Sequence, residues 1–212
     1  MADLLTEVDR YREWASDLTP GLQSSEWESE YGHWAELYDA VLGHVAATPP
    51  EAWSDEEMQA VLYALARDNE GEHLAEEIRL RQPSTLVALT RAALSRGEPD
   101  ARWQLAVQLG DLGGADDEAE RMLIILASDA AEYVRRRALE ALVRVGSPAV
   151  ERLALEAWHR PDEHQQWARM MALESLHRIG SPRLEPLLSE AERDERQYLR
   201  DLAKRIRQGR VD

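Results

Sequence analysis

Apolar residues recur every three to four positions along almost the whole chain, which is the spacing of one face of an α-helix. The first stripe ends before Thr19-Pro20-Gly21, and the second runs from about residue 26 to residue 47, before Thr48-Pro49-Pro50. Strict alternation of apolar and polar residues, the pattern of a β-strand, is not found. The pattern therefore predicts an all-α chain. The first stripe consists of Leu4, Val8, Tyr11, Ala15 and Leu18, and the second of Trp27, Tyr31, Trp34, Tyr38, Val41, Leu42 and Val45.

Three further helices are expected between residues 54 and 95. Ser54 followed by Glu57 is a capping box, in which each side chain bonds the other residue's backbone N–H at the start of a helix. Two shorter helices, around residues 73–81 and 84–95, are separated by Pro83.

The second half of the chain contains a repeat. Residues 102–113, 135–146 and 169–180 have the same length and the same apolar pattern, each from an arginine to a glycine, at steps of 33 and 34 residues. Each unit predicts a helix, a glycine C-cap, a turn and a second helix. One such hairpin cannot bury its apolar face alone, so the copies are expected to stack. The coinciding residues are Arg102, Arg135 and Arg169, then Leu109, Leu142 and Leu176, then Leu112, Val145 and Ile179, and then Gly113, Gly146 and Gly180.

These residues resemble the HEAT repeat in its short bacterial form, in which an acid and Val-Arg precede Ala, Leu and a final Gly. The resemblance is clearest over residues 98–208, where a shortened fourth copy at Leu199-Arg200 resembles a polar C-terminal cap. It implies a right-handed α-solenoid of HEAT-like antiparallel helix pairs, with Arg102, Arg135 and Arg169 bonding acids of adjacent repeats. The best-matching positions are Asp129, Val134, Arg135, Ala138, Leu139, Leu142, Val145 and Gly146.

Two regions are expected. Residues 1–50 form an acidic, aromatic-rich helical region packed on the solenoid, and residues 51–212 form the solenoid itself. No Gly/Ser-rich linker separates them.

The net charge of −16 is concentrated near the N-terminus. Residues 1–66 carry 14 acidic and 2 basic residues, whereas residues 101–212 carry 20 and 18. Such a surface repels phosphate backbones, so nucleic acid is not an expected partner. We expect a basic protein partner that meets the N-terminal third first. The candidate partner-binding residues are Glu26, Trp27, Glu28, Glu30, Glu36 and Asp39.

The aromatic stripe of the second helix has two interpretations. Helical spacing favours packing in the core. Alternatively, aromatic rings surrounded by glutamates would suit an Arg-rich partner through cation–π and charge contacts.

Four Glu-x-x-His pairs raise the question of metal binding. Such pairs build di-iron sites in helical bundles, but the same spacing also gives ordinary pairs on a helix surface, so we predict no metal and no cofactor. The pairs are Glu30/His33, Glu70/His73, Glu156/His159 and Glu174/His177.

The remaining sequence features limit the compartment and the classes of function that are expected. Cysteine is absent, no secretory signal is recognisable, and no apolar run approaches the roughly 20 residues of a membrane span, so a cytoplasmic monomer is expected. The use of 24 Arg against a single Lys suggests a bacterial source. No nucleophile elbow, zinc-binding motif or dinucleotide motif occurs.

HEAT-like stacks serve mostly as protein-binding scaffolds, and their relatives include phycobilin lyases and alkyl-purine DNA glycosylases. We therefore predict a non-catalytic protein-binding scaffold, in concrete form a bacterial immunity or inhibitor protein that covers a basic effector. The alternative is an enzyme of HEAT-like fold: a lyase acting on a protein-bound ligand, a DNA glycosylase or a metal-dependent helical bundle.

Overall fold

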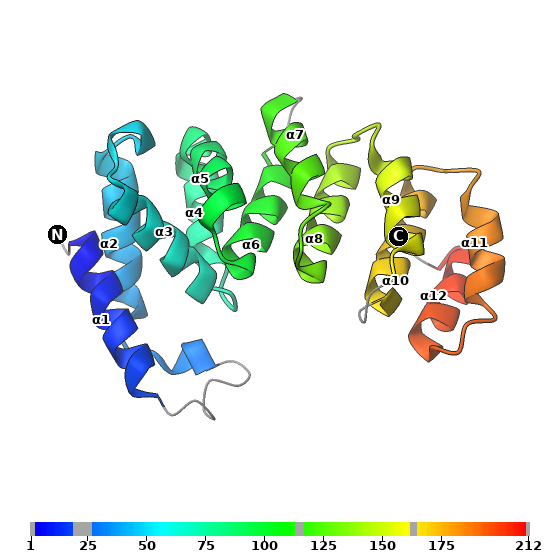
Figure 1. Ribbon diagram of the computed structural model, residues 1–212, viewed down its shortest axis with the longest axis horizontal. Helices are drawn as coiled ribbons and strands as arrows, with labels where there is room; N and C mark the ends of the chain where they lie inside the picture. The colour runs from blue at the N-terminus through cyan, green and yellow to red at the C-terminus, as the bar shows by residue number, and fades with distance from the viewer. Residues whose placement is uncertain (1–2, 19–26, 113–116, 162–164, 211–212) are drawn as a thin grey trace. The chain divides into compact units, whose positions relative to one another are not determined.

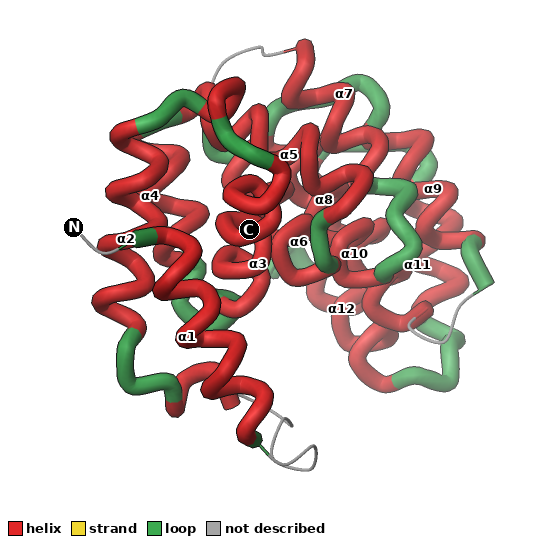
Figure 2. The backbone as a smooth tube through the Cα atoms, turned by 60° about the vertical axis from the view of Figure 1, so that its left-hand side comes forward, coloured by secondary structure: helices red, strands yellow, loops and turns green. Residues whose placement is uncertain are grey.

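The computed structural model describes residues 3–18, 27–112, 117–161 and 165–210. In these residues it contains twelve α-helices, two short 3-10 helices and no β-strand (Figure 1 and Figure 2). The predicted all-helical fold is confirmed. The helices form two compact units, unit 1 (Met1–Leu112) and unit 2 (Gly113–Asp212). None of the described helices combines the length and the hydropathy needed to cross a membrane.

Unit 1 is a bundle of six α-helices. Helix α1 packs against α2 and α3, α2 also packs against α4, and α6 packs against α3, α4 and α5. The predicted stripes face this core: Val8 and Tyr11 of α1 and Leu65 of α3 are fully buried. Helices α1 and α2, from the region expected at residues 1–50, thus pack on helices that follow residue 51. The elements are α1 (Leu4–Asp17), η1 (Trp27–Glu30), α2 (Trp34–Ala47), η2 (Pro50–Ala52), α3 (Asp55–Arg67), α4 (His73–Arg81), α5 (Pro83–Arg96) and α6 (Pro99–Gly110).

The single helix expected over residues 26–47 is wrong, because the chain breaks between the 3-10 helix η1 and α2. The carbonyl of Glu28 explains the break. It accepts the backbone N–H of Tyr31 at 3.1 Å and the indole N–H of Trp34 at 2.9 Å. These donors replace the N–H four residues later that a continuous α-helix would supply.

The start of α3 follows the prediction. Ser54 Oγ accepts the backbone N–H of Glu57 at 3.1 Å, and Glu57 Oε2 accepts the backbone N–H of Ser54 at 2.7 Å. The predicted capping box is therefore confirmed.

Unit 2 consists of helix hairpins, with α8, α10 and α12 packed side by side in one row. Helix α9 joins α8 to α10 and packs on both, and α11 does the same for α10 and α12. The shared apolar face holds the row together, since Leu142 and Leu176 are fully buried. The elements are α7 (Asp117–Leu126), α8 (Glu132–Arg144), α9 (Val150–His159), α10 (Gln165–Arg178), α11 (Leu184–Ala191) and α12 (Gln197–Arg207).

The repeat glycines end their helices in the left-handed conformation. Gly146 has a φ of 70° and Gly180 a φ of 63°, and the next backbone N–H bonds the carbonyl five residues before it. Helix α12 ends in the same way at Gly209, with a φ of 62°, so the shortened copy keeps the cap. Gly113 lies outside the described residues.

Candidate functional site

An open groove in unit 1 runs between α2 and α4 and contains about 1250 Å³ of space. Small and aliphatic side chains of α2 form its floor, and two carboxylates of α2 stand at its edge. Because the floor is apolar and one edge is acidic, the groove can hold an apolar group next to a cation. The groove is lined by Ala35, Glu36, Tyr38, Asp39, Leu42, Gly43, Ala46, His73 and Arg81.

Tyr38 fixes the geometry of this groove. Its ring lies 4.8 Å from the ring of His73, and its hydroxyl donates to Asp68 Oδ1 at 2.7 Å. The other oxygen of Asp68 accepts the backbone N–H of Leu74 at 2.7 Å, near the start of α4. Burial raises the pKa of Asp68, and burial together with the neighbouring Asp68 raises the pKa of Tyr38, so the phenol remains a donor. One buried carboxyl therefore joins α2 to the first turn of α4.

Replacing Asp68 with alanine is expected to lower the free energy of unfolding by about 1–3 kcal/mol, because the Leu74 N–H and the Tyr38 hydroxyl lose their acceptor. Gly71→Ala should also destabilise the protein, since a Cβ there would lie 2.8 Å from Asp68 Oδ1. Urea unfolding measures both changes. Glu70→Ala, on an exposed residue of the same turn, is the control and should cost under about 0.5 kcal/mol. Equal losses at Asp68 and Glu70 would contradict this role.

The predicted partner-binding residues do not all lie together. Glu36 and Asp39 are exposed and line the groove. Glu30 is exposed on η1 and lies outside the groove lining. Glu26 lies outside the described residues. Two acids of the predicted set, Glu36 and Asp39, are thus brought to one surface feature.

Glu28 is a correction to the sequence analysis, which grouped it with the surface acids. It is only 5% exposed, and its carboxylate accepts the side-chain N–H of Asn69 at 3.4 Å. Burial raises its pKa. The break after η1 is the physical reason, because it turns Glu28 inward, away from the polar face of a continuous helix. Glu28 is therefore not available as a surface contact.

The aromatic stripe packs inside unit 1, as helical spacing favours. Tyr31 is buried with its ring 4.6 Å from that of Tyr11. Trp27 is half-buried and stacks on Trp14 at 5.6 Å with 17° between the ring planes. Edge-to-face and stacked rings of this kind add to the apolar burial.

Histidines and acids do not converge on a metal site in the part of the chain that the structure describes, where no group of three or more potential ligands is arranged to hold an ion. Within the described residues, the Glu-x-x-His pairs are therefore not joined by enough further ligands to hold an ion. One nearby contact, from His33 Nδ1 to Glu36 Oε1 at 3.5 Å, follows a different pairing from the predicted Glu30/His33.

The repeat arginines of unit 2 bind mainly backbone oxygens. Arg135 and Arg200 each donate to two carbonyls of the turn before their own helix, five and six residues earlier, at 2.6–2.9 Å. Arg102 of unit 1 likewise donates to the carbonyl of Gly97. These contacts fix the entry of the chain into each repeat helix.

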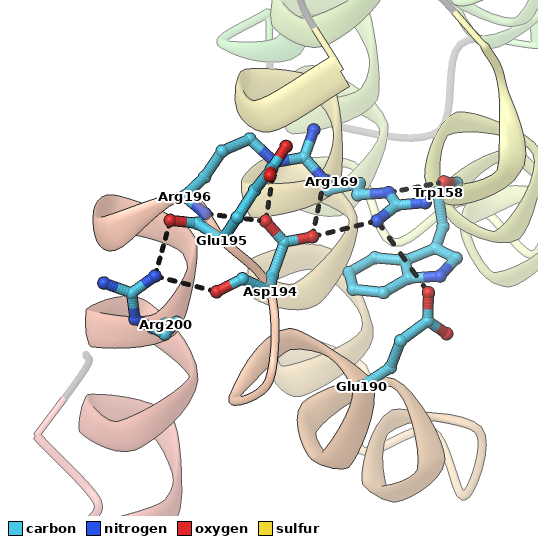
Figure 3. A network of polar contacts seen from close by, with 7 residues as sticks. All are labelled: Trp158, Arg169, Glu190, Asp194, Glu195, Arg196 and Arg200. Atoms are coloured by element: carbon cyan, nitrogen blue, oxygen red, sulfur yellow. Dashed lines mark hydrogen bonds and ion pairs between the residues drawn. The ribbon is translucent and has the colours of Figure 1, made fainter.

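Arg169 makes the expected contact with an acid of the next repeat (Figure 3). Its Nη1 lies 3.2 Å from Asp194 Oδ2, and its Nε donates to the carbonyl of Trp158 at 3.1 Å. The guanidinium also lies over the Trp158 ring, 4.8 Å from its centre. Asp194 in turn accepts the backbone and side-chain N–H groups of Arg196 at 2.5–2.9 Å. This network is structural, since it joins α10 to the turn before α12.

A second contact between repeats uses the serine after each glycine, which the sequence analysis missed. Ser147 Oγ donates to Glu120 of α7 at 2.5 Å, and Ser181 Oγ donates to Glu151 of α9 at 2.9 Å. These glutamates lie on α7 and α9, the helices that come directly before α8 and α10 in the chain. Both serines are followed by proline, in Ser147-Pro148 and Ser181-Pro182, and this shared dipeptide was the available signal.

Comparison with known families agrees with this geometry, because residues 119–205 match the family model of HEAT repeats. Residues 119–205 of unit 2 are thus similar to HEAT repeats in sequence as well as in helix arrangement. The match begins in α7 and ends in α12, so it covers the whole row of packed repeat helices. No curated protein sequence matches the chain. HEAT repeats form helical scaffolds that are often used for protein interaction.

Proposed function

We propose that this protein is a non-catalytic, protein-binding HEAT scaffold whose unit 1 binds a basic partner at the α2–α4 groove. In its most concrete form it is a bacterial immunity or inhibitor protein, a cytoplasmic monomer that covers a basic effector. The single observation that carries the proposal is the position of Glu36 and Asp39, two exposed carboxylates beside an apolar groove.

The charge distribution supports a basic partner. Unit 1 carries 22 acidic and 8 basic residues, whereas unit 2 carries 19 and 17. Arg81, on the α4 side of the groove, is paired with Glu77 at 2.5 Å, so its charge is compensated within its own helix. The uncompensated charge at the groove is therefore negative, which favours and steers a cationic surface.

Reversing both groove carboxylates, as Glu36→Arg/Asp39→Arg, is expected to weaken partner binding about tenfold or more without unfolding the protein. The control is Glu13→Arg/Asp17→Arg, which makes the same charge change at exposed positions of α1 away from the groove. Proteins captured from a host extract by the wild type are identified by mass spectrometry, and the binding rates of the purified partner are then measured for all three chains.

Salt dependence completes the test. If the carboxylates steer the partner, its association rate should fall steeply with ionic strength and its dissociation rate should change less. Equal binding by the groove variant and the control, or a salt-insensitive association rate, would overturn the proposal. Stoichiometric iron or zinc in the purified protein would favour the enzyme alternative.

A further inference from the structure

Unit 2 exposes three aromatic side chains at one register position of its repeats. Tyr133, Trp167 and Tyr198 each precede the repeat arginine by two residues, in the first turns of α8, α10 and α12. Their exposed fractions are 40%, 42% and 62%, and they make up three of the six large apolar side chains that are exposed in the described residues. Because α8, α10 and α12 pack side by side, these residues form an aromatic row across the repeats.

The rings of the aromatic row are held by contacts with neighbouring side chains. The Trp167 and Tyr198 rings are stacked, with centres 6.0 Å apart and 23° between their planes. The guanidinium of Arg136 lies over the Tyr133 ring, 4.7 Å from its centre. The rings are thus held in place while much of their surface stays open to solvent, which suits a binding surface better than a core.

A narrow cleft opens between α8, α9 and α10. Its floor includes Leu139, Leu153 and Met171, and its wall includes Arg136, the same arginine that covers Tyr133. The shared arginine makes the cleft continuous with the aromatic row. The end of an aliphatic side chain of a bound segment can therefore enter the cleft while its neighbours lie on the rings.

The free charge at the cleft is positive. Its two glutamates are paired four residues away on their own helices, Glu132 with Arg136 at 3.1 Å and Glu156 with Arg152 at 2.7 Å. Arg160, which also lines the cleft, makes no hydrogen bond or ion pair with any described residue. A carboxylate of a bound molecule would supply the ion pair that the Arg160 guanidinium lacks.

Two further arginines lie toward the C-terminal ends of α10 and α12. Arg178 of α10 and Arg205 of α12 are exposed, and their side chains form no ion pair in the described parts of the chain. Glu174, half-buried near both, offsets only part of this charge. The cleft beside the row thus presents an unpaired cation, Arg160, on a chain with a net charge of −16.

We infer that this surface binds an acidic linear segment of a partner protein. The end of an aliphatic side chain of the segment enters the cleft, a carboxylate beside it pairs with Arg160, and the flanking residues pack on Tyr133, Trp167 and Tyr198. This goes beyond the groove of unit 1, because it uses different residues and the opposite charge preference.

The test uses the full chain and a phage-displayed library of random dodecapeptides. Enriched peptides should carry Asp or Glu next to Leu, Ile, Met or Phe. Their fluorescein-labelled forms, titrated by fluorescence polarisation, should bind about tenfold or more weakly to Trp167→Ser/Tyr198→Ser and to Arg160→Gln. Ile125→Ser and Arg193→Gln, at exposed positions elsewhere in unit 2, are the matched controls and should bind within about twofold of the wild type.

The remaining outcomes count against the inference. It is overturned if no peptide is enriched, if basic or uncharged peptides are enriched, or if the row and cleft variants bind as well as the controls. Displacement of the peptide by a twelve-nucleotide single-stranded DNA would instead assign the aromatic row to base stacking. Glu36→Arg/Asp39→Arg should leave peptide binding unchanged, which keeps this result separate from that for the groove.

Discussion

Replacing Leu142 or Leu176 with alanine is expected to lower the free energy of unfolding of unit 2 by about 2–5 kcal/mol. Both side chains are fully buried, and they occupy the same place in neighbouring helices of the packed row. Truncation removes apolar contacts and leaves a cavity, which adjacent repeats cannot close without moving apart. Urea unfolding followed by circular dichroism gives the loss, read on the transition of unit 2 if the two units unfold separately.

The matched control is Arg193→Ala, at an exposed position in the same unit, which should cost under about 0.5 kcal/mol. The two leucines test the register of the repeat independently, because each belongs to a different hairpin. Similar losses at the leucines and at Arg193 would show that the alignment of the repeats is incorrect.

The features that could be predicted from the sequence are those governed by nearby residues. The capping box depends on Ser54 and Glu57, three positions apart, and the structure contains both of its hydrogen bonds. The helix ends at Gly146 and Gly180 could also be predicted, because the positive φ of such a cap is favourable only for residues such as glycine. Local chemistry therefore determines the start of α3 and the ends of α8 and α10.

Features that depend on distant partners could not be predicted. The break before α2 arises because the Trp34 indole takes the carbonyl of Glu28, and helical spacing alone gives no sign of that bond. The buried position of Glu28 follows from the break. Ser147 and Ser181 bond glutamates 27 and 30 residues earlier, in another hairpin, so only the stacked structure identifies the pairs.

The candidate groove likewise has one side that could be predicted from the sequence and one that could not. The exposure of Glu36 and Asp39 could be predicted from the polar face of their helix. The opposite side of the groove is formed by His73 and Arg81 of α4, and the contact between Tyr38 and Asp68 that positions α4 is tertiary. The sequence thus indicated that Glu36 and Asp39 are available but not the apolar surface beside them.

Replacing Asp194 is the second change expected to have a large effect. Its carboxylate bonds Arg196, and it also faces Arg169, whose side chain is only 15% exposed. Asp194→Ala removes these contacts and leaves Arg169 with Trp158 and with the more distant carboxylate of Glu190, at 3.8 Å, so a loss of about 3 kcal/mol is expected at neutral pH.

Acid should weaken the same contact in the wild type. The hydrogen bonds from Arg196, with its charge and that of Arg169, lower the pKa of Asp194 from 3.8 to about 2. A carboxyl whose pKa is lowered by folding stabilises the protein fully above its unfolded pKa, and that contribution is lost as the pH falls toward the folded value. The shift corresponds to about 2 kcal/mol, of which roughly half should remain at pH 3.

The difference in unfolding free energy between the wild type and Asp194→Asn should therefore shrink between pH 6 and pH 3. Asp201→Asn, an exposed carboxylate on α12, is the control and should differ from the wild type by under about 0.5 kcal/mol at both pH values. A difference for Asp194→Asn that does not change with pH would show that the carboxylate acts through its shape and not through its charge.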